Sequence, residues 1–361
     1  MNKNSKIYIA GHNGLVGSAI LNNLKAKGYS NFLLRSSKEL DLTNQKDTEE
    51  FFEKERPDYV FLAAAHVGGI VANNVYRADF IFNNLQIQNN VIGSAYKYGV
   101  KKLLFLGSTC IYPALCPQPM NEDFLLTGTL EYTNEPYAIA KIAGLKMCES
   151  FNIQYGTNFI AVMPTNLYGP NDNFDLEKSH VLPALVRKAH LGKCLINKDW
   201  DSIIKDLNTY NIEGVDGNSS KDDILDKLEK YGIKQRNDKV SIEIWGSGKP
   251  LREFLWSEEM ADACVFVMER VDFQDLKPKN GEDIKNLHIN IGTGKEISIK
   301  DLAFLIAKKV GFNGDIVFNA DKPEGTMRKL TDPSKLHALG WHHKIEIDEG
   351  IEKIYDWYKL K

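Results

Sequence analysis

A glycine-rich turn near the N-terminus constrains the fold of this sequence more than any other feature. The turn Gly11-His12-Asn13-Gly14-Leu15-Val16-Gly17 follows a short apolar run, Lys6 to Ala10, and opens a helical pattern from Leu15 to Lys27. A dinucleotide pyrophosphate needs a tight turn, a closely approachable backbone and the N–H groups of a helix N-terminus. Glycines spaced GxxGxxG in this context predict a nucleotide site at the end of a buried parallel strand.

Strand-like and helical patterns alternate along the first 165 residues. Apolar runs recur at Tyr59 to Ala64 and Lys102 to Gly107, with helical patterns between them. This βαβ alternation predicts an α/β fold built on a Rossmann-type doubly wound parallel sheet. We expect residues 1–165 to form the dinucleotide-binding domain, with some later segments returning to it. Residues 166–361 are expected to form a smaller C-terminal α/β region that binds the substrate.

The segment 197–239 stands out as a compositional island, rich in lysine and aspartate. Two amphipathic patterns lie within it, and Ser220 and Asp223 are spaced as a capping pair for the second. The island therefore predicts a helical hairpin inserted into the smaller domain. Either it packs its apolar faces on the body as a solvated appendage, or it serves as a lid or a dimer contact. The residues of the two apolar faces are Trp200, Ile203, Ile204, Leu207 and Tyr210, then Ile224, Leu225, Leu228 and Tyr231.

The bulk properties exclude several classes of protein. A formal net charge of -3 gives no reason to expect a nucleic-acid partner or an acidic membrane surface. No apolar leader or long apolar stretch is visible, and the five cysteines lack metal-ligand spacing. The adjacent pair His342-His343 does not suit one metal ion, so no metal site is expected. These features predict a cytoplasmic protein with reduced thiols.

A set of three residues that follow the glycine turn much later in the chain suggests redox chemistry. Tyr137 and Lys141 are four residues apart, so on a helix they share a face, and Ser108 follows the run that ends at Gly107. A lysine ammonium near a tyrosine favours phenolate, so we expect it to lower the tyrosine pKa from its ordinary value near ~10 toward neutral pH. Tyr137 would then protonate a carbonyl oxygen that Ser108 also binds, while hydride reaches the carbon.

The end of the second strand predicts the cofactor. Phe32, Leu33 and Leu34 lead into Arg35, where an enzyme that prefers NAD usually carries an acid for the ribose 2′-hydroxyl. An arginine suits a 2′-phosphate instead, which favours NADP.

With these motifs, the chain resembles the GDP-L-fucose synthase family of extended short-chain dehydrogenases/reductases. The resemblance covers most of the chain. The motifs that carry it are the Gly11 turn, Ala63 to Ala65, Val67 to Asn74, Ser108 to Pro113, Asn134 to Lys141, Met163 to Pro170, Ser179-His180-Val181, Trp245 to Gly248, Arg252-Glu253-Phe254, Lys322-Pro323-Glu324-Gly325-Thr326 and Arg328-Lys329.

The resemblance implies roles for individual residues. Ser108, Tyr137 and Lys141 match the reductase residues, and Cys110 and His180 match an acid/base pair that epimerises C3 and C5 of a GDP-4-keto sugar. The implied NADPH contacts are Gly11, Asn13, Gly14, Leu15, Val16, Gly17, Arg35, Asp41, Leu42, Ala64, Lys141 and His180. The implied contacts to the GDP-linked substrate are Asn166, Arg187, Trp245, Arg252 and Lys322. Family members are often homodimers, so a homodimer is expected.

Two departures leave the substrate open. His66 stands where the family often has lysine. The 197–239 island makes the segment between the helix at His180 and the strand at Trp245 longer than is usual in the family. The leading interpretation is NADPH-dependent reduction of a C4 ketone with C3/C5 epimerisation. One alternative is a C4 reductase alone, acting on a GDP-4-keto-heptose or another GDP-4-keto-deoxy sugar. A non-catalytic NADP-sensing protein is the alternative from another class.

Overall fold

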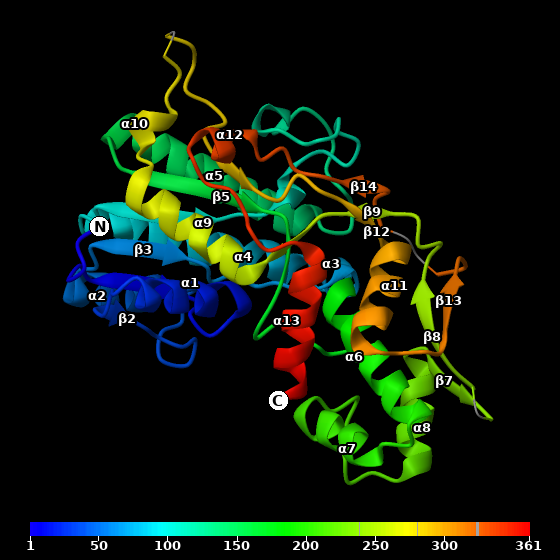
Figure 1. Cartoon of the computed structure of the whole chain (residues 1–361). Helices are drawn as coiled ribbons and strands as arrows, with labels where there is room; N and C mark the ends of the chain where they lie inside the picture. The colour runs from blue at the N-terminus through cyan, green and yellow to red at the C-terminus, as the bar shows by residue number, and fades with distance from the viewer. Residues whose placement is uncertain (238, 280, 323–324) are drawn as a thin grey trace. The chain divides into compact units, whose positions relative to one another are not determined.

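The chain passes repeatedly between two units (Figure 1). The structure, a computed structural model, describes residues 1–361 except 238, 280 and 323–324. Unit 1 comprises Met1–Leu167, Glu253–Lys295 and Leu330–Lys344. Unit 2 comprises Tyr168–Arg252, Glu296–Lys329 and Ile345–Lys361.

Unit 1 is built on a parallel sheet of six strands in the order β11-β5-β4-β3-β1-β2. The predicted Rossmann-type doubly wound sheet is therefore confirmed. The second and third strands of the chain lie on opposite sides of β1, so the order reverses there and opens a crevice beside its carboxyl end. The strands are β1 (Ile7–Ala10), β2 (Phe32–Leu33), β3 (Tyr59–Leu62), β4 (Lys102–Leu106), β5 (Phe159–Pro164) and β11 (Ile289–Ile291).

Alternate residues of each strand enter two separate cores, because successive side chains point to opposite faces of a sheet. Ile7 and Ile9 pack in the core that includes residues of α1 and α9. Tyr8 and Ala10 pack in the core that includes residues of α2, α4 and α5. The helices of unit 1 are α1 (Leu15–Ala26), α2 (Gln45–Glu55), α3 (Ile70–Val75), α4 (Arg77–Lys97), α5 (Glu135–Tyr155), α9 (Ser257–Arg270), α10 (Phe273–Leu276) and α12 (Ser334–Ala338).

Glu253 joins the later segments of unit 1 to one another. Its side chain is fully buried, and its carboxylate accepts hydrogen bonds from the backbone N–H groups of Thr293 (2.5 Å), Gly294 (2.8 Å) and Thr331 (2.9 Å). Hydrogen bonds to a charged group are the stronger kind, so one carboxylate joins three distant stretches of chain. Short elements complete the unit: the 3-10 turns η1 (Thr109–Ile111) and η2 (Glu122–Phe124), the strand β10 (Phe254–Trp256), and β6 (Asn166–Tyr168) at its boundary.

Unit 2 contains two small sheets, ordered β13-β8-β7 and β12-β9-β14. Their strands are β7 (Ile233–Arg236), β8 (Lys239–Trp245), β9 (Leu251–Arg252), β12 (Ile297–Ser298), β13 (Asp315–Asn319) and β14 (Arg328–Lys329). The helices are α6 (Val181–Ile196), α7 (Trp200–Thr209), α8 (Lys221–Lys230), α11 (Ile299–Val310) and α13 (Ile347–Lys359). Across the described residues of both units, no helix is long and apolar enough to span a bilayer.

The 197–239 segment forms α7 and α8 and then a strand that the sequence pattern did not predict. The Ser220 hydroxyl accepts a hydrogen bond from the Asp223 N–H (3.2 Å) and donates one to the Asp223 carboxylate (2.6 Å), so the predicted capping pair is present. The strand β7 pairs antiparallel with β8. The segment is thus joined to the sheet of unit 2 as well as packed by its helices.

Candidate active site

The glycine turn lies between β1 and α1, and steric crowding explains two of its glycines. Gly11 has a φ of 85°, and a Cβ on it would lie 2.8 Å from the backbone nitrogen of Ala64 at the end of β3. A Cβ on Gly17 would lie 2.1 Å from the Gly11 carbonyl oxygen. Both positions therefore require glycine. Gly14 is the N-cap of α1, so the first N–H groups of that helix face the turn.

A cleft of about 590 Å³ adjoins this turn in unit 1. Of the predicted cofactor contacts, Gly11, Asn13, Gly14, Arg35, Asp41, Leu42 and Ala64 line it. Leu15, Val16 and Gly17 continue from the turn into α1. The cleft is large enough for a small organic ligand, and the N-terminus of α1 beside it favours an anion.

Arg35 stands at one end of the cleft and is held in place by its neighbours. Its Nη1 donates to the Leu34 carbonyl (2.8 Å), and its Nη2 donates to the Glu55 carboxylate (3.2 Å). The side chain is 37% exposed, so the guanidinium is fixed and still accessible to a ligand. Ser36 and Ser37 line the cleft beside it.

Ser108, Tyr137 and Lys141 are positioned by β4 and α5. Ser108 follows the carboxyl end of β4, and its hydroxyl accepts a hydrogen bond from the Cys110 N–H (3.3 Å). Lys141, 4% exposed, donates to the carbonyl of Leu106 at the end of the same strand (2.8 Å). Its Nζ lies 5.6 Å from the centre of the Tyr137 ring. The carboxyl end of β4 and one face of α5 thus bring a hydroxyl, a phenol and an ammonium together.

The expected lowering of the Tyr137 pKa is wrong for this structure. Burial, and then the nearby Cys110, raise the pKa of Tyr137 above its usual value. Burial also lowers the pKa of Lys141 to about 8, although Cys110 opposes this effect. The spacing of four residues predicted the closeness of the two groups, but it carried no information on desolvation. Tyr137 is therefore a neutral phenol, which is the form that can donate a proton.

The lowered pKa of Lys141 predicts an alkaline limb in the pH profile. Lys141 is charged below its pKa and loses its proton as the pH rises through about 8. If the charged form supports Tyr137, kcat should fall by about tenfold per pH unit above that value. Steady-state rates measured from pH 6 to 10 would reveal the limb. Lys141→Arg stays charged over this range and should lose the limb, whatever its absolute rate. A limb that persists in Lys141→Arg would assign it to another group.

Cys110 lies in η1, two residues after Ser108, and is 7% exposed. The turn η1 packs against α5, the helix that carries Tyr137 and Lys141, and besides the larger effect of burial Cys110 shifts the pKa of both groups upward. Asn166, at the start of β6, donates through Nδ2 to the Glu253 carbonyl (2.9 Å). His180 belongs to unit 2, where it is the exposed N-cap residue of α6.

Two of the predicted substrate contacts meet in unit 2. Trp245 ends β8 and is 54% exposed, and the Lys322 Nζ lies 5.5 Å from the centre of its ring. Arg252 in β9 donates through Nη1 to the Leu251 carbonyl (2.8 Å), and a Cβ on Gly325 would lie 2.9 Å from its Nη2. Pro323 and Glu324 of the Lys322 motif lie outside the described residues.

Arg187 is not placed as a substrate contact. The side chain is fully buried, and its Nε (3.0 Å) and Nη2 (2.8 Å) both donate to the Asp206 carboxylate. Nη1 donates to the Phe174 carbonyl (3.1 Å), and Nη2 also donates to the Tyr210 carbonyl. Tyr358 donates to the other oxygen of Asp206. The guanidinium is therefore engaged inside unit 2 by Phe174, by Asp206 of α7 and by Tyr210 at the C-cap of α7, which the family resemblance did not indicate.

We expect the Arg187–Asp206 pair to matter for stability. Asp206→Ala leaves a buried guanidinium without its counter-charge and should lower the free energy of unfolding by about 3–5 kcal/mol. The double variant Arg187→Met/Asp206→Leu removes both charges and should cost less than Asp206→Ala alone. Urea unfolding of the three proteins would measure this difference. A change below about 1 kcal/mol in Asp206→Ala would contradict the buried pairing.

Several residues that line the cleft were not predicted from the sequence. His12 lies inside the glycine turn, and Ser36 and Ser37 directly follow Arg35, so their positions in the motifs were the available signal. His66, noted only as a departure, also lines the cleft, and its ring lies 4.7 Å from that of Phe80. Phe80 in turn contacts Tyr137 edge to face at 6.4 Å. Among the described residues, no group of three or more His, Cys, Asp or Glu side chains could hold a metal ion.

The chain is similar to several known proteins over nearly its whole length. The model of the NAD dependent epimerase/dehydratase family matches residues 7–209 and 196–292. GDP-L-fucose synthase 1 of Arabidopsis thaliana is 49% identical over 356 residues, which cover 99% of this chain and 94% of that protein. A solved GDP-6-OMe-4-keto-L-xylo-heptose reductase from C. jejuni is 47% identical, with a TM-score of 0.92 and coverage of 100% and 99%. A GDP-mannoheptose C4 reductase from Campylobacter jejuni, solved with NADP bound, is also 47% identical, with a TM-score of 0.86 and coverage of 99% of both chains.

Proposed function

The chain belongs to the NAD dependent epimerase/dehydratase family and, within it, to the GDP-L-fucose synthase family. From this we propose that it is an NADPH-dependent reductase of a GDP-linked 4-keto sugar. The observation that carries the proposal is the convergence of Ser108, Tyr137 and Lys141 at the end of β4. A hydroxyl and a neutral phenol beside a charged amine suit protonation of a ketone oxygen. The proposal requires a hydride donor next to this group.

The residues of the cleft fit NADP as that donor. Because Gly11 and Gly17 carry no Cβ, the turn can pack closely against Ala64 and against itself. The N-terminus of α1, which follows the turn, suits a pyrophosphate. When bound, NADPH supplies hydride to the ketone carbon. Ser108 would orient the ketone oxygen by donating its hydroxyl proton in a hydrogen bond. Tyr137 would give its proton to that oxygen, and Lys141 would stabilise the phenolate that remains.

Arg35 offers a direct test of the preference for NADPH. A hydrogen bond from its guanidinium to a 2′-phosphate is charge-assisted, so Arg35→Gln should raise the KM for NADPH by about 10–100-fold. The KM for NADH should change little, because NADH carries no phosphate at that position. Steady-state kinetics with both cofactors would separate the two effects. Arg270→Gln, on α9 at an exposed position, is the matched control. Equal changes for NADPH and NADH would remove Arg35 from the phosphate site.

We extend the proposal to epimerisation at C3 and C5. Hydrogens on carbons that flank a ketone are acidic, and Cys110 lies beside the reductase residues. His180 is the proposed second acid/base group and a cofactor contact. Asn166, Trp245, Arg252 and Lys322 are proposed to bind the GDP-sugar, and Arg187 is withdrawn from this set because its guanidinium is occupied. In this proposal residues 1–165 bind NADP and residues 166–361 bind the substrate.

A second candidate is C4 reduction alone, with a GDP-4-keto-heptose as substrate. It is favoured by the two solved heptose reductases that match nearly the whole chain at 47% identity. Incubation with GDP-4-keto-6-deoxymannose and NADPH in deuterated water, followed by NMR of the product, distinguishes the candidates. Deuterium at C3 and C5 with the L-galacto configuration supports epimerisation followed by reduction. Oxidation of NADPH without deuterium at those carbons supports a reductase only. If no reaction occurs, a GDP-4-keto-heptose is tested next.

We also propose a cytoplasmic homodimer. None of the five cysteines, all of which lie in the described part of the chain, forms a disulfide, which suits a reducing compartment. On α4 and α5, Tyr96 and Tyr155 are 41% and 47% exposed and stack with their ring centres 4.4 Å apart, beside Ile153 at 53% exposure. Such an apolar surface suits burial against a second copy. Sedimentation equilibrium should give twice the chain mass, and Tyr155→Glu should shift the protein toward monomer.

A further inference from the structure

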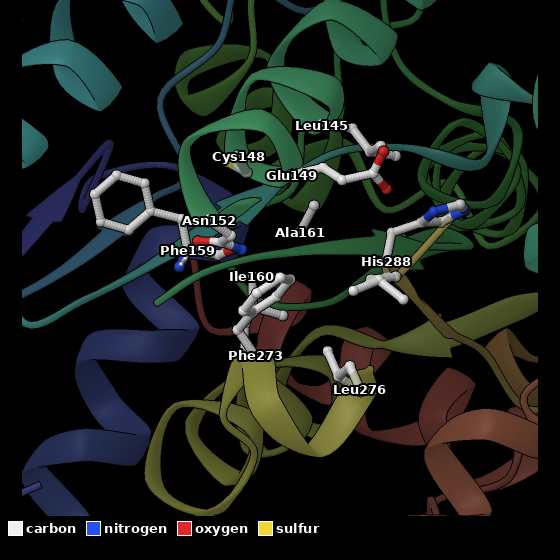
Figure 2. Close-up of a pocket in the computed structure, with 11 residues that line it drawn as sticks. Leu145, Cys148, Glu149, Asn152, Phe159, Ile160, Ala161, Phe273, Leu276 and His288 are labelled. Carbon is white, nitrogen blue, oxygen red and sulfur yellow. Dashed lines mark hydrogen bonds between the residues drawn. The ribbon is translucent and has the colours of Figure 1, made fainter. Parts of the chain in front are cut away.

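A small cavity in unit 1 lies between α5, β5 and α10, away from the cleft (Figure 2). Its volume is about 20 Å³. Most of its wall is apolar, and the apolar residues include Leu145, Phe159, Phe273 and Leu276. Three polar side chains also line it: Glu149 and Asn152 from α5, and His288, the residue before β11. Figure 2 shows the Glu149 carboxylate and the His288 ring on the same side of the cavity.

Each of these two side chains has one buried atom without a hydrogen-bond partner in the part of the chain that the structure describes. The atoms are Glu149 Oε2 and His288 Nδ1. His288 is 2% exposed, so bulk water does not reach its ring freely. Buried polar atoms in folded proteins almost always have a hydrogen-bond partner, either another protein group or an ordered water. Two unpaired atoms at one cavity therefore point to a missing partner.

The hydrogen bonds around His288 determine which of its nitrogens carries the proton. Asn290 donates through Nδ2 to the Met120 carbonyl (3.0 Å), which leaves its Oδ1 as an acceptor. The Tyr112 hydroxyl donates its only proton to that Oδ1 (2.6 Å). In the contact of 3.0 Å with His288 Nε2, the Tyr112 oxygen must then be the acceptor, so Nε2 carries the proton.

His288 Nδ1 consequently carries no proton and has a free lone pair. Burial lowers the pKa of His288 well below its usual value, and the nearby Lys335 and Lys146 lower it further, so the ring is neutral and has a single N–H. That N–H is the one at Nε2. Nδ1 can only accept a hydrogen bond.

Glu149 presents a second acceptor to the cavity. Its Oε1 accepts a hydrogen bond from Lys146 (2.8 Å), which balances the carboxylate charge, and its Oε2 is left over. Asn152, the remaining polar side chain of the wall, is already engaged: its Nδ2 donates to the Phe159 carbonyl (2.7 Å), and its Oδ1 accepts from the Phe159 N–H (2.8 Å). Two acceptors cannot bond to each other, so both need a donor.

We propose that this cavity is a binding site for one small neutral molecule with two hydrogens to donate, an ordered water, which bridges Glu149 Oε2 and His288 Nδ1. A cavity needs at least about 10–15 Å³ to hold a water, and its volume of about 20 Å³ admits one such molecule. The apolar wall leaves no further ligand groups for a larger polar molecule. The balancing charge of Lys146 favours a neutral occupant over a cation.

The bridging water would complete a chain of hydrogen bonds inside unit 1. The chain runs from Glu149 on α5 through the water to His288, and from there through Tyr112 to Asn290 in β11. Helix α5 also carries Tyr137 and Lys141, and Tyr112 follows η1, the turn that contains Cys110. The water therefore ties the helix of the proposed acid to the turn of the proposed epimerase thiol. The site itself does not depend on the proposed reaction.

Crystallography and NMR of the full chain test the site. A crystal structure should show one density peak within hydrogen-bond distance of both atoms, and a thallium(I) soak should leave no anomalous peak there. The ¹⁵N spectrum should show the Nε2-protonated tautomer of His288 with a hydrogen-bonded Nδ1. An empty cavity, a thallium peak or an Nδ1-protonated ring would each overturn the proposal, and the thallium peak would indicate a monovalent cation.

A pair of variants tests the bridge in solution. Glu149→Met removes one of the two acceptors, so the His288 Nδ1 resonance should move toward that of a nitrogen without a hydrogen bond. Glu269→Met removes a glutamate of similar exposure that bonds to Tyr29 instead, and it should leave the resonance unchanged. An Nδ1 resonance that is unaffected by Glu149→Met would contradict a water held by both residues. If Glu149→Met does not fold, the tautomer and density of the unaltered protein still decide.

Discussion

Replacing Tyr137 with phenylalanine is expected to lower kcat for NADPH-dependent reduction by about 10²–10⁴-fold, the usual contribution of a positioned general acid. The variant removes one oxygen and keeps the ring, so the edge-to-face contact with Phe80 should survive. Because the pKa of Tyr137 is raised by burial, the phenol holds its proton at neutral pH and can deliver it to a ketone oxygen. The measurement is the decrease of NADPH absorbance under saturating substrate.

Two controls make the Tyr137→Phe result specific. The Kd for NADPH, measured by fluorescence titration, should stay within about twofold, since the glycine turn and Arg35 line the cleft and Tyr137 is not among its lining residues. Tyr155→Phe, on the same helix, should keep the rate of the unaltered protein. A Tyr137→Phe variant with normal turnover would rule out Tyr137 as the acid. If the unaltered protein bound NADPH but turned over no GDP-4-keto sugar, the NADP-sensing interpretation would gain support.

Local patterns in the sequence predicted the parts of the fold that depend on neighbouring residues. Each of these features depends on residues that are close together in the sequence: the glycine turn, the apolar runs of the parallel sheet and the Ser220 cap. The strand β11 could not be placed in this way, because it joins the edge of the sheet after more than a hundred intervening residues. Its pairing with β5 depends on segment 253–295 returning to unit 1, where the buried Lys102 of β4 donates to the carbonyls of Val267, Met268 and Val271.

At the site, too, the sequence predicted what depends on local spacing and did not predict what depends on contacts between distant residues. The spacing of Tyr137 and Lys141 predicted their closeness, but the direction of the Tyr137 pKa shift depends on burial by residues far along the chain. Arg187 was assigned to the substrate from the family resemblance alone. Its carboxylate partner, Asp206, lies 19 residues away in a segment whose packing the sequence left open. Motifs identify residue types at a site, whereas burial and partners determine what those residues do.

Replacing Cys110 with serine should separate the two proposed activities. In deuterated water, incorporation of deuterium at C3 and C5 should fall by about 10²–10⁴-fold, because a hydroxyl is a much weaker proton donor than a thiol. Reduction of a ketone that needs no epimerisation should keep most of its rate, since Ser108, Tyr137 and Lys141 are untouched. Product NMR gives the first quantity, and NADPH oxidation gives the second. Cys116→Ser, at a thiol six residues away, should change neither.

The pattern of loss in Cys110→Ser decides between the candidate functions. Cys110 is buried beside Tyr137 and Lys141, so a purely structural role would predict parallel loss of both activities together with a lower unfolding free energy. Selective loss of deuterium incorporation, with unfolding by urea unchanged, would assign the thiol to proton transfer at C3 or C5. If the unaltered protein incorporates no deuterium and Cys110→Ser reduces a GDP-4-keto-heptose normally, the thiol is a retained group in an enzyme that only reduces C4.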